Sequence, residues 1–307
     1  MTFSVTVLGS SASIPAYGRF PSSQVVNHNE HLFLVDCGEG TQIRLSQYGF
    51  RRGRIHHIFI SHLHGDHFFG LMGILTTMSL LGRKKPLHLY SQSQIMEVIR
   101  VQLEVAQSRL LFEVILHPLD EVRQEVVYEN EVLEVVVIPL KHRVPCWGFL
   151  FREKRLSRRF LAEKAEQHRI PFRMISRLKA GEDYVTPSGE VIKSSEVTAD
   201  PPVPRSYAYI SDSAYDEDLV PRIKGVDLLY HEATFDEANR KRAEQTFHST
   251  AKDAARIASL AEAKQLLIGH YSAKFKSLDG LLTEAQEVFP NTLLAMDGKV
   301  YEVGTGQ

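Results

Sequence analysis

Five hydrophobic runs in this sequence are each followed, within a residue or two, by a histidine or an aspartate. These polar residues are His62, His142, Asp212, His231 and His270. Short runs rich in Ile, Leu, Val and Tyr are typical of buried strands. Because open α/β sheets place their sites at the carboxyl ends of their strands, we expect polar side chains from several strand ends to converge on one edge. The pattern favours a layered α/β fold.

Strand and helix patterns alternate along most of the chain. We expect strands at Phe3–Leu8, Ser23–His28, His31–Val35, Ile55–Ile60, Leu87–Tyr90, Leu111–His117, Glu131–Leu140, Ser206–Ser211, Val226–Tyr230, Lys264–Ile268 and Thr292–Ala295. We expect helices at Thr41–Tyr48, Leu71–Leu81, Gln94–Ala106, Asp216–Ile223, Ser249–Ala261 and Leu278–Val288. The 307 residues are enough for one layered α/β domain that carries an insertion.

The segment from Phe151 to Pro204 interrupts this alternation between two stretches of core strand. Within residues 151–180, ten lysines and arginines stand against three glutamates. Such a charge run, taken alone, is typical of a solvated helical insertion. The whole chain has a net charge of −1, so an anionic partner can be inferred only from local clustering of this kind.

Cysteine usage and the distribution of apolar residues predict a cytoplasmic protein that does not enter a membrane. Cys37 and Cys146 are the only cysteines and have no CxxC spacing, which fits a reduced compartment. The first nine residues have no basic region and predict a strand, so we expect no signal peptide. The most apolar stretch, Phe68–Leu81, contains two glycines and is too short to span a bilayer.

The densest group of metal-binding side chains lies in Ser61-His-Leu-His-Gly-Asp-His67. Three imidazoles and a carboxylate crowd onto one turn, which makes sense if they share cations, and Gly65 lets the turn fold tightly. One loop cannot surround two ions, so His142, Asp212 and His270 are the natural further donors. Asp212 could bridge two cations about 3.5–4 Å apart, which would clamp a scissile group and lower the pKa of a trapped water.

HxHxDH followed by distant His, Asp and His resembles the metallo-β-lactamase superfamily. Three further motifs, with the position of the basic insertion, resemble the ribonuclease Z (tRNase Z) family, endonucleases that trim the 3′ end of precursor tRNA. These motifs are Asp36-Cys-Gly-Glu-Gly-Thr-Gln42, His231-Glu-Ala-Thr-Phe235 and His248-Ser-Thr250. The resemblance covers nearly the whole chain, in order.

The resemblance implies a fold and a domain organisation. The fold is an α/β, four-layered αββα metallo-β-lactamase sandwich with an inserted basic arm. Residues 1–150 and 205–307 would form the catalytic domain, and residues 151–204 the tRNA-binding arm, or exosite. Lysines and arginines along such an arm neutralise backbone phosphates without recognising sequence, which suits an enzyme that accepts many tRNAs. The family also implies a homodimer in which one subunit's arm holds precursor tRNA for the other's site.

The resemblance also implies a zinc-dependent endoribonuclease that hydrolyses the phosphodiester between tRNA and its 3′ trailer and leaves a 3′-hydroxyl on the tRNA. It assigns two zinc ions per subunit, with manganese or cobalt as substitutes. The first zinc is assigned His62, His64, His142 and Asp212, and the second Asp66, His67, Asp212 and His270. Asp66 also accepts a proton from the attacking water, whereas Glu232 and His248 support proton delivery to the leaving 3′ oxygen.

Two other functions stay open on the sequence alone. A hydrolase of a small phosphodiester, sulfate ester or thioester would use the same metals and need no arm. A non-catalytic RNA-binding protein with a degenerate fold would have lost ligands, yet all seven are present. Taken singly, His231 and His248 are typical of core or surface histidines, and Glu232 of a helix cap or of a carboxylate that supports a metal ligand. The remaining histidines are expected to be structural or solvent-facing: His28, His31, His56, His57, His88, His117 and His168.

Three segments depart from the family pattern. The loop Pro15-Ala-Tyr-Gly-Arg-Phe20 lacks the Lys and Asn of a Pro-x-Lys-x-Arg-Asn element that is associated with tRNAs already bearing CCA. The Gly-Pro element of the arm is absent around Ile170-Pro171-Phe172, so we expect a differently built arm tip. The usual Gly-Asp-Thr is Ser211-Asp212-Ser213, which keeps the carboxylate.

Overall fold

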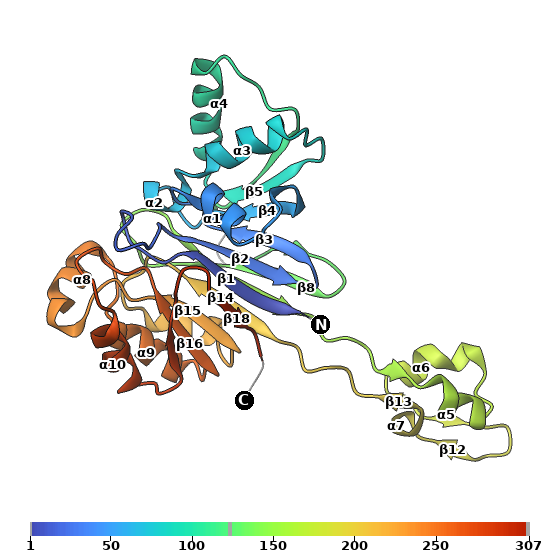
Figure 1. The fold of residues 1–307 in the computed structure, drawn as a ribbon. Coiled ribbons are helices and arrows are strands. Elements are labelled where there is room, and N and C mark those ends of the chain that lie inside the picture. Colours follow the sequence, from blue (N-terminus) through green and yellow to red (C-terminus); the bar gives the residue numbers. More distant parts are fainter. Residues whose placement is uncertain (1, 122–124, 305–307) are drawn as a thin grey trace. The chain divides into compact units, whose positions relative to one another are not determined.

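The computed structural model describes residues 2–121 and 125–304 and divides into two compact units (Figure 1). The core unit comprises Met1–Tyr128, Val135–Phe151 and Arg205–Gln307. The second unit, called the arm below, comprises Glu129–Glu134 and Arg152–Pro204. None of the helices within the described ranges is long and apolar enough to cross a membrane.

The first sheet of the core unit has seven strands in the order β18-β1-β2-β3-β4-β5-β6. They are β1 (Phe3–Gly9), β2 (Ser23–His28), β3 (His31–Val35), β4 (Ile55–Phe59), β5 (Leu87–Ser91), β6 (Val114–Pro118) and β18 (Val300–Glu302). Pairing is antiparallel from β18 to β3 and parallel from β3 to β6. Three helices share a buried hydrophobic cluster with this sheet: α1 (Thr41–Gln47), α3 (Leu71–Leu80) and α4 (Ile95–Val105).

The second sheet also has seven strands, in the order β17-β16-β15-β14-β9-β8-β7. They are β7 (Val126–Glu129), β8 (Leu133–Pro139), β9 (Trp147–Glu153), β14 (Ser206–Ile210), β15 (Leu228–Glu232), β16 (Gln265–Gly269) and β17 (Thr292–Leu294). The strands from β14 to β17 are parallel. The helices that follow β15 and β16 are α8 (Arg240–Thr246), α9 (Ala251–Leu260) and α10 (Asp279–Gln286).

Aromatic side chains fill the layer between the two sheets. Phe33 of β3 lies 5.6 Å, between ring centroids, from Phe151 of β9, and Phe59 of β4 lies 5.2 Å from Phe149 of β9. All four rings are almost completely buried. Because each strand turns alternate residues to opposite faces, the other face of each sheet is left to pack on helices. The result is the expected four-layered αββα sandwich.

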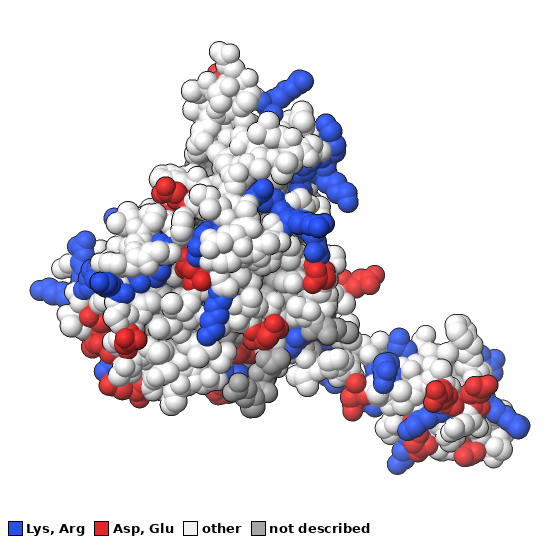
Figure 2. Space-filling view, in the orientation of Figure 1, with Lys and Arg blue, Asp and Glu red and all other residues white. Residues whose placement is uncertain are grey.

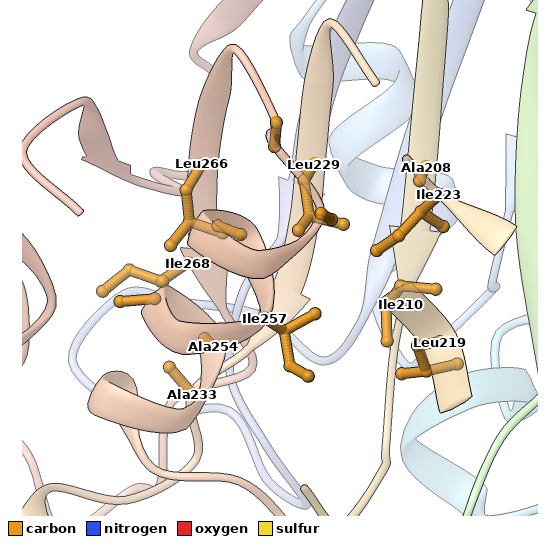
Figure 3. Close-up of a cluster of buried hydrophobic side chains, with 14 of the residues drawn as sticks. Ala208, Ile210, Leu219, Ile223, Leu229, Ala233, Ala254, Ile257, Leu266 and Ile268 are labelled. Atoms are coloured by element: carbon orange, nitrogen blue, oxygen red, sulfur yellow. The ribbon is translucent and has the colours of Figure 1, made fainter. Parts of the chain in front are cut away.

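Helix α9 covers the outer face of the second sheet (Figure 3). The sequence starts this helix with a capping box, in which the Thr250 hydroxyl accepts from the Asp253 amide while the Asp253 carboxylate accepts from the Thr250 amide. Ile257 then packs in one cluster with Ile210 of β14 and Leu229 of β15, all fully buried. The helix therefore fixes the strands whose ends carry the candidate site.

Most expected elements are present within one to three residues of their expected ends, but one is wrong in type. Residues Glu217–Arg222 form a 3₁₀ helix with Pro221 inside it, not an α-helix. Proline has no amide hydrogen to donate, which disfavours the regular α-helical ladder. Helix α8 and strands β7 and β18 are not predicted from the sequence, because they are short or lack a clear apolar period. Strand β9 is not predicted either, although it has seven residues and its first five are buried. Phe151 belongs to β9 and is fully buried in the core unit.

The arm is built from short elements around a small core of its own. Its strands pair as β10 (Arg159–Phe160) with β13 (Thr198–Ala199) and β11 (Tyr184–Val185) with β12 (Val191–Ile192). Its helices are α5 (Ala162–Gln167), α6 (Ile175–Lys179) and α7 (Ser194–Val197). Leu178, Ile192 and Val197 are buried at its centre. The arm therefore has the packing of an independent small unit.

We expect Ile257→Ala to lower the free energy of unfolding by about 2–5 kcal/mol, because it leaves a cavity between α9 and the sheet. Urea unfolding of the intact chain measures the change. Leu260→Ala on the same helix is the matched control. Leu260 is 47% exposed, so its truncation should change stability by no more than about 0.5 kcal/mol. Equal losses for both variants would contradict the packing described for α9.

Candidate metal centre and active site

The ends of four strands and one short helical turn carry the predicted metal donors. They are His62 and His64 after β4, Asp66 and His67 on α2 (Gly65–Phe68), His142 after β8, Asp212 after β14 and His270 after β16. Donor atoms of all seven fall into groups whose members lie within 4.8 Å of one another. Residues more than 200 positions apart in the sequence therefore meet in one place.

His231, the fifth strand-end residue of the sequence pattern, lies inside β15. Its register partners Ile210 and Ile268 belong to the core cluster beneath α9, and residues paired across strands share a face of the sheet. The fully buried His231 ring places its Nδ1 2.7 Å from the carbonyl oxygen of Glu232. His231 is therefore a core histidine.

The first donor group gathers His62, His64 and His142 around one oxygen of Asp212. Nε2 of His62 lies 2.9 Å from Nδ1 of His64 and 3.6 Å from Oδ2 of Asp212. Nε2 of His142 lies 3.4 Å from the same His64 nitrogen and 3.9 Å from the same Asp212 oxygen. Four donors thus face one common point.

The second donor group gathers Asp66, His67 and His270 around the other oxygen of Asp212. Oδ1 of Asp212 lies 3.3 Å from Nε2 of His67 and 3.2 Å from Nε2 of His270. Oδ2 of Asp66 lies 3.5 Å from the His67 nitrogen and 3.4 Å from the His270 nitrogen. The group itself has three members, and Asp212 approaches two of them, His67 and His270.

The donor chemistry fits a pair of divalent cations. Tetrahedral zinc with ligands at about 2.0–2.1 Å has ligand–ligand separations of about 3.3 Å, and the separations in both groups lie close to that value. Nitrogen and carboxylate oxygen are the ligand atoms that zinc, manganese and cobalt accept. Asp212 is 2% exposed and turns one oxygen to each group, as a bridging carboxylate requires.

The surrounding charges keep the two aspartates ionised. Burial would raise the pKa of Asp212, but the facing rings of His270, His67 and His62 hold it well below its usual range. Burial also opposes ionisation of Asp66, and His67 and His270 likewise lower its pKa. Metal ligation requires the deprotonated carboxylate, so both groups are already in the required form near neutral pH.

A second layer of hydrogen bonds holds four of the imidazoles by their outer nitrogens. Nδ1 of His67 lies 2.7 Å from Oδ2 of Asp36, and Nδ1 of His142 lies 3.0 Å from the Phe247 carbonyl oxygen. The remaining partners are Ser61 Oγ at 3.1 Å from His62 Nδ1 and Thr234 Oγ1 at 2.9 Å from His270 Nδ1. Such partners fix the tautomer and orientation of metal-binding histidines.

Asp36 begins one of the family motifs of the sequence, but the sequence assigned no role to its side chain. Its side chain is fully buried and also accepts from the Ser61 amide at 2.7 Å and the Tyr209 hydroxyl at 2.7 Å. Its φ of 55° lies in the left-handed region, which costs free energy for a residue other than glycine. Residues with such strained backbones cluster at functional sites. Asp36 directly follows β3, so the strand-end pattern that marked the ligands could also have found it.

Glu232 and His248 form a hydrogen-bonded pair beside the donor groups. Nδ1 of His248 donates to Oε1 of Glu232 at 2.8 Å, and Nε2 of His248 lies 4.0 Å from Oδ2 of Asp212. The fully buried Glu232 carboxylate also accepts from the Ser213 amide and from the amide and hydroxyl of Thr234. Burial lowers the pKa of His248, but the Glu232 and Asp212 carboxylates outweigh it and raise that pKa to about 9.

An open cleft of about 490 Å³ gives access to these groups and is called the metal cleft below. Its lining comprises Ser13, Ile14, Pro21, Glu39, His64, Gly65, Asp66, Phe69, Arg143, Asp212, His248 and His270. The Ser13 amide donates to Oδ2 of Asp66 at 2.7 Å and so fixes that carboxylate at the cleft wall. Phe69 is 68% exposed beside it. Four of the seven predicted metal donors, His64, Asp66, Asp212 and His270, therefore line an open cleft.

Of the histidines outside this centre, three from β4–β6 form a row of rings. His57 stacks on His88 with ring centroids 5.0 Å apart, and Nδ1 of His88 lies 2.9 Å from Nε2 of His117. Within residues 2–121 and 125–304, no group of three metal donors includes them. Burial lowers the pKa of His57 to about 3, so this ring stays neutral as a packing element.

Comparison with known proteins identifies the family. The chain is 45% identical to ribonuclease Z of Bacteroides fragilis over 295 residues, which covers 96% of this chain and 97% of that protein. It is 46% identical to ribonuclease Z of Porphyromonas gingivalis, with 95% and 96% coverage. The chain belongs to the ribonuclease Z family. The resemblance found in the sequence motifs is thereby confirmed.

Solved structures agree with this membership. Human tRNase Z, short form, superposes with a TM-score of 0.71 at 28% identity, covering 97% of this chain and 98% of that one. A metallo-β-lactamase fold protein from Bacillus subtilis, at 21% identity and a TM-score of 0.69, shows the same fold. A family model described as anti-Pycsar protein Apyc1 also matches residues 3–156, which include the Ser61–His67 turn and His142 but end before Asp212.

We expect Asp36→Asn to weaken divalent metal binding by about 10–100-fold, because His67 loses the carboxylate that orients it. Competition with a chromophoric chelator measures the affinity. Asp227→Asn is the control, since Asp227 is also buried but bonds Ser206 and Lys264 instead of a donor histidine. Unfolding of both variants without metal separates lost affinity from lost stability. Equal metal affinity in the two variants would contradict the role of Asp36.

Proposed function

We propose that this chain is a metal-dependent endoribonuclease that removes the 3′ trailer from precursor tRNA and leaves a 3′-hydroxyl on the tRNA. The observation that carries the proposal is the shared carboxylate of Asp212 between two donor groups, beside the Glu232–His248 pair, in a ribonuclease Z family member. A two-cation centre suits hydrolysis of a phosphodiester, and a hydrogen-bonded acid beside it suits a leaving alkoxide.

The proposed cofactors are two zinc ions per subunit, with manganese or cobalt as substitutes. His62, His64 and His142 would hold the first ion and Asp66, His67 and His270 the second, with Asp212 bridging them. When bound, such a pair activates water and offsets the charge that develops on the phosphate. The buried second layer of hydrogen bonds supports this assignment, because it keeps the donor nitrogens pointing inward.

Asp66 and His248 are proposed to move the two protons of the reaction. Water attacks phosphorus, Asp66 accepts a proton from the water, the P–O3′ bond breaks, and His248 donates a proton to the departing 3′ oxygen. The products are a tRNA with a 3′-hydroxyl and a trailer with a 5′-phosphate. Glu232 supports His248 by holding its Nδ1, which leaves Nε2 turned towards Asp212. Both proton-transfer groups line the metal cleft.

The arm is proposed to bind the body of precursor tRNA, and the family homodimer to present it to the other subunit's site. Six of the ten cations in residues 151–180 have no ion-pair partner among the residues that the structure describes: Arg155, Arg159, Lys164, Arg169, Arg173 and Lys179. Over residues 151–204 the excess is smaller, eleven basic residues against eight acidic ones, and Figure 2 shows both signs on this unit. The first half of the arm is therefore the proposed phosphate-binding part.

We expect His248→Ala to slow cleavage of labelled precursor tRNA by about 10²–10⁴-fold, because the 3′ alkoxide needs a proton to leave. Hydrolysis of bis(p-nitrophenyl) phosphate should fall far less, since its leaving group needs none. Glu232→Gln should also slow both reactions, by smaller factors. Gln245→Ala, an exposed position on α8, is the control.

Metal content must be measured alongside, because His248 also lies within reach of Asp212 and His270. Retention of both ions with an equal loss on the two substrates would refute proton donation by His248. Mapping the labelled product ends tests the function itself: the cut should leave a 3′-hydroxyl on the tRNA, and a chain that leaves precursor tRNA intact would overturn the proposal.

Replacement of residues 155–203 by a short Gly-Ser linker should abolish tight binding of precursor tRNA and its steep salt dependence while aryl phosphodiester hydrolysis survives. Lost phosphate contacts remove about one unit each from the slope of log affinity against log salt. The double variant Arg169→Ala with Arg173→Ala should weaken tRNA binding and reduce its salt dependence by smaller amounts. Unchanged tRNA affinity in the deletion variant would contradict the proposed arm.

A further inference from the structure

A second cleft of about 470 Å³ lies beside the metal cleft in the core unit and is called the side cleft below. Its lining comprises Ala12, Ser13, Ile14, Thr234, Phe235, Asn239, Arg242, Thr246, His248, Ser272, Ala273 and Lys274. Ser13, Ile14 and His248 also line the metal cleft, so the two clefts meet at these residues. None of the seven predicted metal donors lines the side cleft. His248 therefore stands between the metal centre and a separate cavity.

The side cleft has the chemistry of a nucleotide site. Arg242 and Lys274 are exposed at its wall and have no ion-pair partner within the described part of the chain, so both charges are available to a phosphate. Asn239 offers an amide that can donate and accept hydrogen bonds. Phe235 lines the cleft with a largely buried ring whose centroid lies 6.2 Å from that of His248. Proteins commonly bind nucleotides with basic side chains that contact the phosphate and with aromatic and amide side chains that contact the base.

The walls of the side cleft are tied to the catalytic segments. The Phe235 amide donates to the Ser249 carbonyl, and the Ser272 amide donates to the Thr234 carbonyl at 3.2 Å. Lys274 packs over the Phe275 ring, with its Nζ 4.7 Å from the centroid. The segments that carry Glu232, His248 and His270 thus also build this cavity, which places it at a fixed position relative to the reacting atoms.

The direction of bond cleavage decides which nucleotide occupies the side cleft. The bond that breaks joins phosphorus to the 3′ oxygen of the last nucleotide of the tRNA body, and His248 gives its proton to that oxygen. The phosphate itself stays with the trailer at the metal centre. The nucleoside that carries the departing oxygen must then lie on the His248 side of the centre, away from the metal donors. The side cleft is the cavity found there.

We propose that the side cleft binds the nucleotide that becomes the 3′ end of the tRNA, with Arg242 and Lys274 contacting its 5′ phosphate and Phe235 and Asn239 contacting its base. This proposal rests on the proposed tRNA 3′-processing function and adds the polarity of the bound strand. The trailer then leaves along the metal cleft, past Phe69 and Arg143.

The test compares two tRNA inhibitors of bis(p-nitrophenyl) phosphate hydrolysis. One is the product tRNA that ends at the cleavage site, and the other is the same tRNA shortened by its last nucleotide. Because they differ only in the nucleotide assigned to the side cleft, their ratio of inhibition constants isolates this contact from the arm. In the wild-type chain we expect the longer tRNA to bind about tenfold more tightly. Arg242→Ala combined with Lys274→Ala should lower this ratio well below the wild-type value, because only the base contacts of Phe235 and Asn239 remain.

The neighbouring cations Lys241 and Lys276 supply matched controls, because both are exposed and neither lines the side cleft. Lys241→Ala with Lys276→Ala removes the same charge and should keep the wild-type ratio. A ratio of one in the wild-type chain, or an unchanged ratio in the Arg242–Lys274 variant, would overturn the proposal. The proposal would also be overturned if a 5′-phosphorylated trailer oligonucleotide inhibited the Arg242–Lys274 variant more weakly than the wild-type chain. That result would assign the side cleft to the trailer.

Failure of the proposed function gives a different result. In that case the wild-type chain hydrolyses the aryl ester but leaves precursor tRNA uncut, and the side-cleft proposal falls with it. Cleavage of precursor tRNA at the expected bond combined with a ratio of one rejects the side cleft alone.

Discussion

The buried carboxylate of Asp212 is the constraint on which the rest of the site depends. One of its oxygens faces His62 and His142 and the other faces His67 and His270. A buried anion is costly unless several partners surround it, and here the partners come from both sheets. The two sheets must therefore hold a fixed register against each other, which the aromatic layer between them provides.

The second layer of hydrogen bonds around the donor histidines also joins the two sheets of the core unit. Asp36 from the first sheet holds His67 and accepts from Tyr209 of the second sheet. Phe247, which adopts a left-handed φ of 58°, turns its carbonyl to His142 just before the chain reaches His248. The backbone segment Phe247–His248 therefore positions both His142 and the Glu232–His248 pair. The side cleft is lined by residues of these segments as well, so both clefts are built on the same edge of the core unit.

Local patterns predicted much of this structure, and the one element predicted with the wrong type has a local cause. The strand-end donors and capped helix α9 followed from hydrophobic period and capping chemistry. The segment Glu217–Arg222 did not, because Pro221 favours a tighter 3₁₀ turn than its apolar spacing suggested. The basic character of the arm also looked stronger in residues 151–180 than it is over the whole insertion, where acidic residues follow.

The sequence by itself determined the donor types, their order and the family, because ligand chemistry and motif spacing are properties of the chain. It also predicted that polar residues at strand ends converge on one edge, which the structure shows for four of the five residues but not for His231. Only the tertiary structure decided that His231 faces the core while Glu232 faces the site, since one residue of strand register exchanges the two faces. It alone revealed Asp36 as a support of His67 and the cavity beyond His248, because both arise from segments that are distant in sequence.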